Sequence, residues 1–207
     1  MLQHGVGTIT FYEPETKEFA ALGHGILDVD TSKLIDIGKG ELVTSKIVSI
    51  VKGENGKPGE IKGSIENGTS IGEINKNTFF GIYGKINNSA PLNINTKNAI
   101  EVANRNEIKT GEASILCTLD ESGPQEYKIN IDKIYYNNNT NNKSMLIRVT
   151  DEKLIEKTGG IIQGMSGSPI IQNGKFVGAI THVLVNDSKE GYAVFGDMML
   201  KQMRTTE

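Results

Sequence analysis

Short apolar runs separated by turn residues recur along almost the whole chain. Runs such as TFFGIYGKI, ASILCTL and KFVGAITHVLV alternate with turn-like stretches such as ENGKPG, ENGT and NGK. Many short strands bounded by Gly, Asn and Pro are typical of a β-sandwich or a β-barrel. The pair Asn173-Gly174 is the strongest hairpin signal, because both residues tolerate the positive φ angles of a two-residue turn. We therefore expect an all-β fold.

Two segments carry helical signals. The stretch DEKLIEK, from Asp151 to Lys157, begins with an N-cap candidate and is followed by a glycine pair that would end a helix. The tail GDMMLKQMRTTE places methionines at a roughly helical spacing. A short helix ahead of residue 160 and a C-terminal helix are therefore expected.

Composition excludes several classes of function. The 207 residues suit one domain of two lobes, spanning 1–207. The net charge is −3 and the Lys and Arg residues are scattered, so no nucleic-acid partner is expected. No apolar run approaches the roughly 20 residues of a membrane span, and the first residues do not resemble a signal peptide. The chain itself is not expected to cross a membrane.

Metal and disulfide chemistry also lack a signal. Cys117 is the single cysteine and lies among apolar residues, which excludes an intramolecular disulfide and favours a buried thiol. The three histidines, His4, His24 and His182, are isolated from one another and from any metal-binding motif. We predict neither a metal nor an organic cofactor.

The segment GMSGSP, Gly164 to Pro169, is richer than a simple turn requires. Its glycines would allow the backbone N–H groups of Gly164 and Ser166 to converge beside the Ser166 hydroxyl, as in an oxyanion hole. The pattern differs from the G-x-S-x-G elbow of α/β-hydrolases, because Ser168 occupies the last glycine position. From the pattern alone, Ser166 is either a nucleophile or a turn residue.

A nucleophilic serine needs a base, and the three histidines are the candidates. His24 follows an apolar strand and lies between two glycines, whereas His4 lies near the chain terminus. His182 lies in GAITHV, where Thr181, His182 and Val183 would line a substrate pocket in a two-barrel peptidase, or else be structural.

Several carboxylates compete to orient the base. They are Asp28, Asp30, Asp120, Asp132 and Asp151. Spacing does not choose among them, and Asp151 has the alternative role of helix N-cap.

Two long stretches resemble the stage IV sporulation protein B peptidase family of endospore-forming bacteria. They are GVGTITFYEPETKEFAALGHGILDVDT and RVTDEKLIEKTGGIIQGMSGSPIIQNGKFVGAITHVLVND. The resemblance implies a trypsin-like double β-barrel and a serine endopeptidase. It places the catalytic histidine at His24, the aspartate at Asp151 and the serine at Ser166. The aspartate lies much closer to the serine than is usual for a trypsin-like enzyme.

The family also implies a biological setting. Its members carry an N-terminal membrane anchor and a PDZ domain, which are expected to be absent from this chain. They act between the forespore and mother-cell membranes, where they cleave a membrane-bound regulator of an intramembrane protease, and also themselves. That cleavage leads to maturation of a late sigma factor. An edge strand left exposed without the PDZ domain would favour a homo-oligomer. The alternatives are a peptide-binding module that no longer cuts efficiently and a structural β-barrel protein of the spore.

Overall fold

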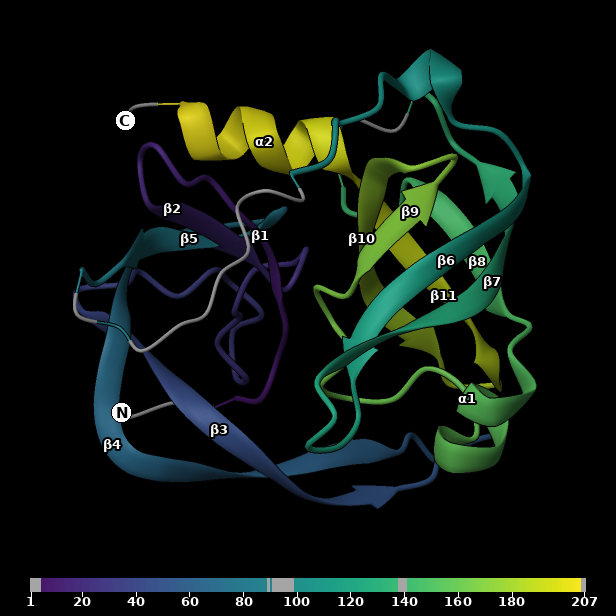
Figure 1. The fold of residues 1–207 in the computed structure, drawn as a ribbon, viewed down its shortest axis with the longest axis horizontal. Helices are drawn as coiled ribbons and strands as arrows, with labels where there is room; N and C mark the ends of the chain where they lie inside the picture. Colours follow the sequence, from purple (N-terminus) through teal and green to yellow (C-terminus); the bar gives the residue numbers. More distant parts are fainter. Residues whose placement is uncertain (1–4, 89, 91–98, 138–140, 206–207) are drawn as a thin grey trace.

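The strands form two lobes that lie side by side (Figure 1). The computed structural model describes residues 5–88, 90, 99–137 and 141–205. The first lobe contains β1 (Ile9–Tyr12), β2 (Glu18–Ala21), β3 (Gly40–Val51), β4 (Glu60–Thr78) and β5 (Gly81–Ile86). The second lobe contains β6 (Gly111–Thr118), β7 (Pro124–Ile134), β8 (Met145–Val149), β9 (Pro169–Gln172), β10 (Lys175–Leu184) and β11 (Asp187–Phe195). The expected all-β, two-lobed fold class is confirmed.

The second lobe is a closed barrel, with its strands in the order β10-β11-β8-β7-β6-β9. Its interior is filled by alternate residues of each strand, as the two-residue period of a strand requires. Ile115, Ile131 and Ile147, from three successive strands, are fully buried. The predicted hairpin joins β9 to β10, and Asn173 and Gly174 have φ angles of 52° and 76°.

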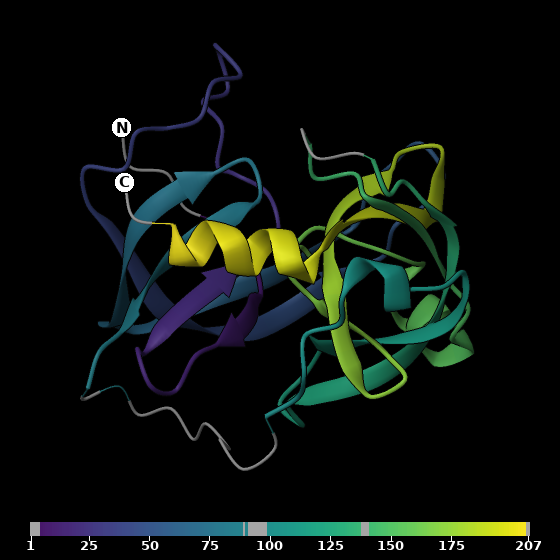
Figure 2. The same cartoon turned by 90° about the horizontal axis from the view of Figure 1, so that it is seen from above.

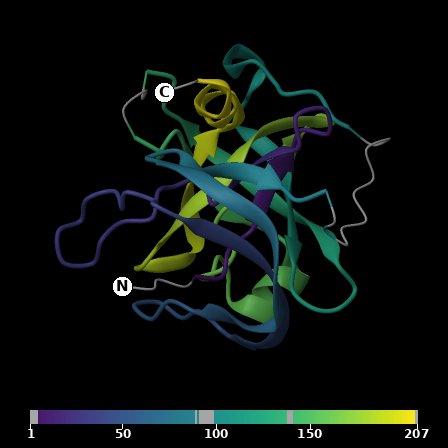
Figure 3. The ribbon, with the colours of Figure 1, turned by 90° about the vertical axis from the view of Figure 1, so that its left-hand side faces the viewer.

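The first lobe is an open sheet in the order β1-β2-β5-β4-β3, seen from its own side in Figure 3. This half-barrel and the closed barrel of the second lobe together agree with the expected trypsin-like double β-barrel. The short strand β1 forms one edge, whereas β3 forms the other edge and runs past its own lobe with β4 (Figure 1). Within the described residues β1 and β3 do not pair with each other, so the sheet does not close.

The chain does not reverse at ENGT, where the sequence suggested a turn. β4 continues through this stretch, and the pairing with β3 jumps from Val43↔Ser70 to Ser45↔Ile65. The register of β4 against β3 therefore shifts between Ile65 and Ser70, and Gly68, within this stretch, has a φ of 58°. The other turn, ENGKPG, does join β3 to β4.

The long β3–β4 hairpin reaches the second lobe. Near its tip, Gly53 N–H donates to Thr158 O at 2.8 Å and Gly56 N–H donates to Val185 O at 2.7 Å. Where β4 begins, Glu60 pairs with Gln163 in a parallel bridge. The hairpin therefore contacts the segment that leads into the serine loop.

Both predicted helices are present. α1 (Glu152–Thr158) ends at Gly159, whose φ of 76° is the left-handed conformation common at helix ends. α2 (Gly196–Arg204) buries Met198, Met199 and Met203 and contacts β2 and β10, so it bridges the two lobes (Figure 2). A 3₁₀ turn, η2, spans Arg105–Glu107. Within the residues that the structure describes, no helix is long and apolar enough to span a membrane.

Candidate active site

Ser166 lies in a tight loop between α1 and β9. Gly164 and Gly167, on either side of it, have φ angles of 98° and 92°. A Cβ at Gly167 would lie 2.3 Å from Thr8 O and 2.6 Å from Leu22 N, so only glycine allows this approach. The loop is thereby brought against the segment that carries His24.

The half-buried Ser166 hydroxyl is directed toward β10. Its Oγ donates to Thr181 O at 3.1 Å, and the next residue, Gly167, donates its N–H to Ile180 O at 2.8 Å. These two bonds fix the serine loop beside the strand that was expected to line the substrate pocket.

His24 follows β2 through a strained turn. Gly23 N–H donates to Ala21 O at 2.9 Å, which closes a three-residue turn with Leu22 at its centre. Leu22 has a φ of 69°, which is costly for a branched side chain. Strain of this kind is often found where a functional side chain is held in place.

The His24 ring has one ordered hydrogen bond. Its Nδ1 lies 2.9 Å from Gly25 O. Because a carbonyl oxygen only accepts, Nδ1 carries the proton, and Nε2 of the neutral ring is left as an acceptor. Burial lowers the pKa of His24, partly opposed by the bond to Gly25 O, so the neutral form is favoured near pH 7. This is the form that a general base needs.

The loops of Ser166 and His24 are in contact, although their functional atoms are not hydrogen-bonded. A Cβ at Gly23 would lie 3.1 Å from Thr181 Cγ2 and 3.3 Å from Ile180 O, which places the histidine loop on the strand that receives the Ser166 hydroxyl. Among the described residues, Ser166 Oγ bonds to Thr181 and not to His24. Catalytic bonds are often unformed in a free enzyme, and rotation about one side-chain bond redirects the serine hydroxyl.

Two backbone amides at the loop are available as donors. Neither Gly164 N–H nor Ser166 N–H has an acceptor within the part of the chain that the structure describes. The carbonyl on the other side of each peptide plane is fixed: Gln163 O accepts from Ile61 N–H at 2.8 Å, and Met165 O accepts from Ser168 N–H at 2.9 Å. In a trans peptide the C=O and N–H point in opposite directions, so these bonds set the direction of both free amides.

Asp151 is occupied as the N-cap of α1. Its Oδ1 accepts from the N–H groups of Lys153 at 3.0 Å and Leu154 at 3.1 Å. Its Oδ2 accepts from Lys128 N–H at 3.2 Å. The structure therefore gives Asp151 the alternative role considered from the sequence and does not bring its carboxylate to His24.

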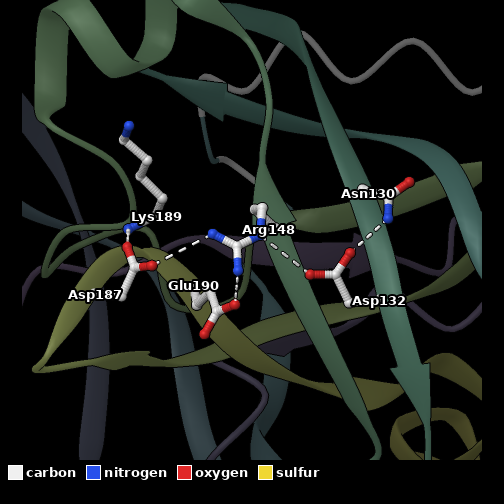
Figure 4. A network of polar contacts seen from close by, with 6 residues as sticks. All are labelled: Asn130, Asp132, Arg148, Asp187, Lys189 and Glu190. Carbon is white, nitrogen blue, oxygen red and sulfur yellow. Dashed lines mark hydrogen bonds and ion pairs between the residues drawn. The ribbon is translucent and has the colours of Figure 1, made fainter.

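Asp132 belongs to a network of charges around Arg148 (Figure 4). Arg148 Nε contacts Asp132 Oδ2 at 3.2 Å and its Nη1 contacts Asp187 Oδ2 at 3.3 Å, while its Nη2 pairs with Glu190. Asn130 donates to the other Asp132 oxygen at 2.5 Å. The network ties β7, β8 and β11 together, and Asp132 is thus engaged away from His24.

The remaining candidate carboxylates that have printed contacts bond to residues other than His24. Asp120 pairs with Lys157 and with Ser122 in the β6–β7 turn. Asp28 accepts from Thr31 N–H at 2.8 Å, within an exposed loop that also contains Asp30. Among the described residues, no carboxylate bonds to His24, and Gly25 O is its orienting group.

Thr181, His182 and Val183 all lie on β10 beside Ser166. The His182 ring is 5.2 Å from the His24 ring, measured between centroids, with the ring planes tilted by 36°. Desolvation, followed by the nearby His24 and Lys143, lowers the pKa of His182 to about 4, so the ring is neutral near pH 7. The Thr181 hydroxyl is directed into the fold, where its Oγ1 donates to Tyr192 O at 3.1 Å.

Other groups are separate from this site. Cys117 is buried, and burial raises the pKa of its thiol to about 12. A hollow of about 260 Å³ lies over β6, β7 and β9 and is lined by Ser114, Glu126 and Lys128 among others, with neither Ser166 nor His24. Within the described ranges, no group of His, Cys, Asp and Glu side chains is arranged to hold a metal. His4 lies outside the described residues.

Sequence reasoning missed the residues that support the loops. Thr8, Leu22 and Ile61 each contact the serine loop or hold the histidine turn. The Thr8 contact joins positions 156 residues apart, and no local pattern signals such a pair. The positive φ of Leu22 could not be predicted from the sequence either, because leucine rarely adopts such an angle.

Comparison with protein families identifies the chain. The family model described as SpoIVB peptidase S55 matches residues 2–200. The chain belongs to this peptidase family. Its resemblance to the sporulation peptidases is thus confirmed, and the protein is a hydrolase of the serine protease class. No curated protein matches it significantly.

Solved structures similar to this SpoIVB-family chain are also proteases. The inactive form of the Rv3671c protease is 16% identical, with a TM-score of 0.41, over 67% of this chain and 74% of that one. The active form from M. tuberculosis is 14% identical, with a TM-score of 0.41, over 100% and 94%. The HtrA-type protease AlgW with decapeptide is 14% identical, with a TM-score of 0.46, over 75% and 50%. At these values none of the three bears on the chemistry of this chain.

Proposed function

We propose that this chain is a serine endopeptidase in which Ser166 is the nucleophile and His24 the general base. The observation that carries the proposal is the meeting of three parts. These are a serine hydroxyl, a histidine whose Nδ1 proton is held by Gly25 O, and two unbonded amides on the serine loop. Acyl transfer needs all three within one site.

The reaction would begin when the Ser166 hydroxyl rotates from Thr181 O toward His24 Nε2. His24 takes the proton as Oγ attacks the peptide carbonyl, and the Gly164 and Ser166 N–H groups stabilise the resulting oxyanion. His24 then gives that proton to the departing amine, which leaves an ester on Ser166. Water, deprotonated by His24, hydrolyses the ester and restores the serine. No metal or organic cofactor enters these steps.

The substrate is proposed to bind along β10 at Thr181, His182 and Val183. These residues pair with β11 on one side, through His182↔Tyr192 and Val183↔Gly191. On the other side, among the residues that the structure describes, β9 pairs only with the earlier part of β10, from Lys175 to Ala179. An extended peptide can therefore add as a strand along the free edge, with its side chains alternating across the surface.

Asp151 remains the third catalytic residue that the family resemblance predicts. Its present contacts are those of a helix cap, so a role toward His24 would need a different arrangement of this carboxylate. The neutral carbonyl of Gly25 sets the same Nδ1–H tautomer that a triad aspartate sets, without its charge.

The biological role is proposed from the family. The substrate would be a membrane-bound regulator of an intramembrane protease, cleaved in the space between forespore and mother-cell membranes during sporulation, and the chain would also cleave itself.

A fluorophosphonate probe followed by intact-mass measurement tests the chemistry. We expect one adduct on the wild-type chain, none on Ser166→Ala, and strongly reduced labelling on His24→Ala. Ser168→Ala is the matched control, because Ser168 lies in the same loop with its hydroxyl buried and unbonded. Labelling that survives Ser166→Ala would refute the assignment.

A peptide-binding module is the second candidate, favoured by the bond from Ser166 Oγ to Thr181 O in place of His24. Such a module would bind an extended peptide at β10 but take up no probe. Peptide binding without labelling, in a folded sample, would select this candidate over the peptidase.

A further inference from the structure

Thr8 is the point at which the serine loop and the histidine loop are joined. It lies immediately before β1, which is on the side of the first lobe that faces the second (Figure 1). Its backbone N–H donates to Ser166 O at 3.0 Å, and its backbone C=O accepts from Leu22 N–H at 3.2 Å. One residue thus holds the carbonyl of the nucleophile and the strained residue ahead of His24.

The Thr8 side chain makes a third bond that the backbone does not dictate. Its Oγ1 donates to Gly164 O at 3.2 Å. That carbonyl belongs to the peptide between the two proposed oxyanion donors, Gly164 and Ser166. The hydroxyl therefore restrains the middle of three consecutive peptide planes.

The other two planes are restrained by backbone bonds alone. Ile61 N–H holds Gln163 O, and Ser168 N–H holds Met165 O. Without Thr8 Oγ1, Gly164 O has no other donor among the described residues. The N–H end of the same plane is held by the backbone, since Met165 N–H donates to Ile162 O at 3.1 Å. Loss of the Thr8 bond therefore removes one of the two bonds on this plane and leaves its carbonyl end unrestrained, next to a glycine whose positive φ shows its conformational freedom.

We propose that Thr8 is a positioning residue for this site: its hydroxyl fixes the Gly164 peptide so that the amides of Gly164 and Ser166 converge. The inference rests on the proposed function, since it assigns those amides to the oxyanion. Thr8 does not touch the substrate or the reacting atoms, and acts only through the loop.

Three variants separate this role from general stability. Thr8→Val keeps the shape and the β-branch but removes the donor, whereas Thr8→Ser keeps the donor. Thr10→Val is the matched control, because Thr10 is a buried threonine in the adjacent strand whose hydroxyl has no hydrogen-bond partner. We expect Thr8→Val to lower the rate of Ser166 labelling by about three- to tenfold, as the loss of one neutral hydrogen bond allows. Thr8→Ser and Thr10→Val should label at the wild-type rate.

Peptide cleavage by the same variants would show the loss in kcat with KM little changed, because the oxyanion amides act on the transition state. Amide hydrogen exchange supplies a readout that does not require activity. Exchange of the Gly167 and Ser168 N–H groups should become roughly twofold faster or more in Thr8→Val, and should be unchanged in Thr8→Ser and Thr10→Val.

The outcomes are distinguishable. Faster exchange in Thr8→Val, with a wild-type chain that neither labels nor cleaves, would show that the Thr8 hydroxyl restrains the loop but would refute the peptidase, and with it the assignment of the two amides to an oxyanion. Unchanged exchange and unchanged rates in Thr8→Val would overturn the inference while leaving the peptidase intact. Equal losses in Thr8→Val and Thr10→Val would also overturn it, since the effect would then be one of folding.

Discussion

Replacing Asp151 tests whether its carboxylate caps a helix, serves the histidine, or does both. Asp151→Ala removes the acceptor for Lys153 and Leu154 N–H, and N-cap losses of this kind cost about 1 kcal/mol. It also leaves Lys128 N–H without its acceptor, which adds about 1 kcal/mol. We expect Asp151→Ala to lower the free energy of unfolding by about 2 kcal/mol.

Asp151→Asn is the informative partner of that variant. Its Oδ1 still caps the helix, while its amide nitrogen no longer accepts from Lys128 N–H, so the expected cost is about 1 kcal/mol. Unfolding in urea, with the slope compared between variants, measures both values. An Asp151→Ala chain as stable as the wild type would refute the capping assignment.

The activity of Asp151→Asn then decides the catalytic question. In a trypsin-like triad the same change lowers kcat by about 10⁴. The contacts of Asp151 in the structure favour labelling of Ser166 within a few-fold of the wild-type rate. A loss of several orders of magnitude, at nearly wild-type stability, would show that the carboxylate serves His24 in the working enzyme. Loss of activity in Asp151→Ala alone would not show a catalytic role for the carboxylate, because that change also destabilises the helix ahead of the serine loop.

Three further predictions concern the base, the oxyanion loop and the hairpin. Burial lowers the pKa of His24, so the acid limb of the kcat/KM profile should lie below the usual histidine range, and an acid limb above about 6.5 would contradict the role of His24 as base. Because the unfolded chain binds the proton more readily, the free energy of unfolding should also fall as the pH drops below about 6.5. Gly164→Ala places a Cβ 3.0 Å from Ile61 Cβ at a residue whose φ is 98°. We therefore expect the rate of Ser166 labelling to fall by about 10²–10³, which is the effect of losing one oxyanion donor. Labelling at the wild-type rate would argue against Gly164 N–H as that donor. Asn173→Ala should lower the unfolding free energy by about 1 kcal/mol because residue 173 has a φ of 52°, whereas Asn173→Gly should change it little; equal losses in urea unfolding would contradict the turn argument.

The sequence predicted those parts of the fold that depend on neighbouring residues. The Asn173-Gly174 hairpin, the helix capped by Asp151 and the amphipathic tail each follow from local preferences and are present. The stretch ENGT shows the limit of such preferences. The register of β4 against β3 shifts across this stretch, but β4 pairs with β3 on both sides of it, which keeps the chain in one direction.

The candidate site was predicted only as separate pieces. Ser166 and His24 were proposed from their glycine-rich surroundings, and their loops do meet in the structure. The carboxylate did not follow from spacing, because side chains such as Asp132 are taken by partners that the sequence does not reveal. Thr8 and Ile61 orient the peptide groups of the serine loop by hydrogen bonds to its carbonyls. These bonds depend on tertiary contacts, so neither residue could be predicted from the sequence.

The Thr8–Gly164 contact also has a consequence for the order in which the molecule folds. Its two residues are separated by 156 positions, and the β3–β4 hairpin is likewise far in sequence from the loop that it holds. Closing such long loops costs entropy before any contact is gained, so the nucleophile loop should be among the last parts to reach its final form. A nascent or partly folded chain would then possess the serine and the histidine, yet have no proteolytic activity until the two lobes had docked.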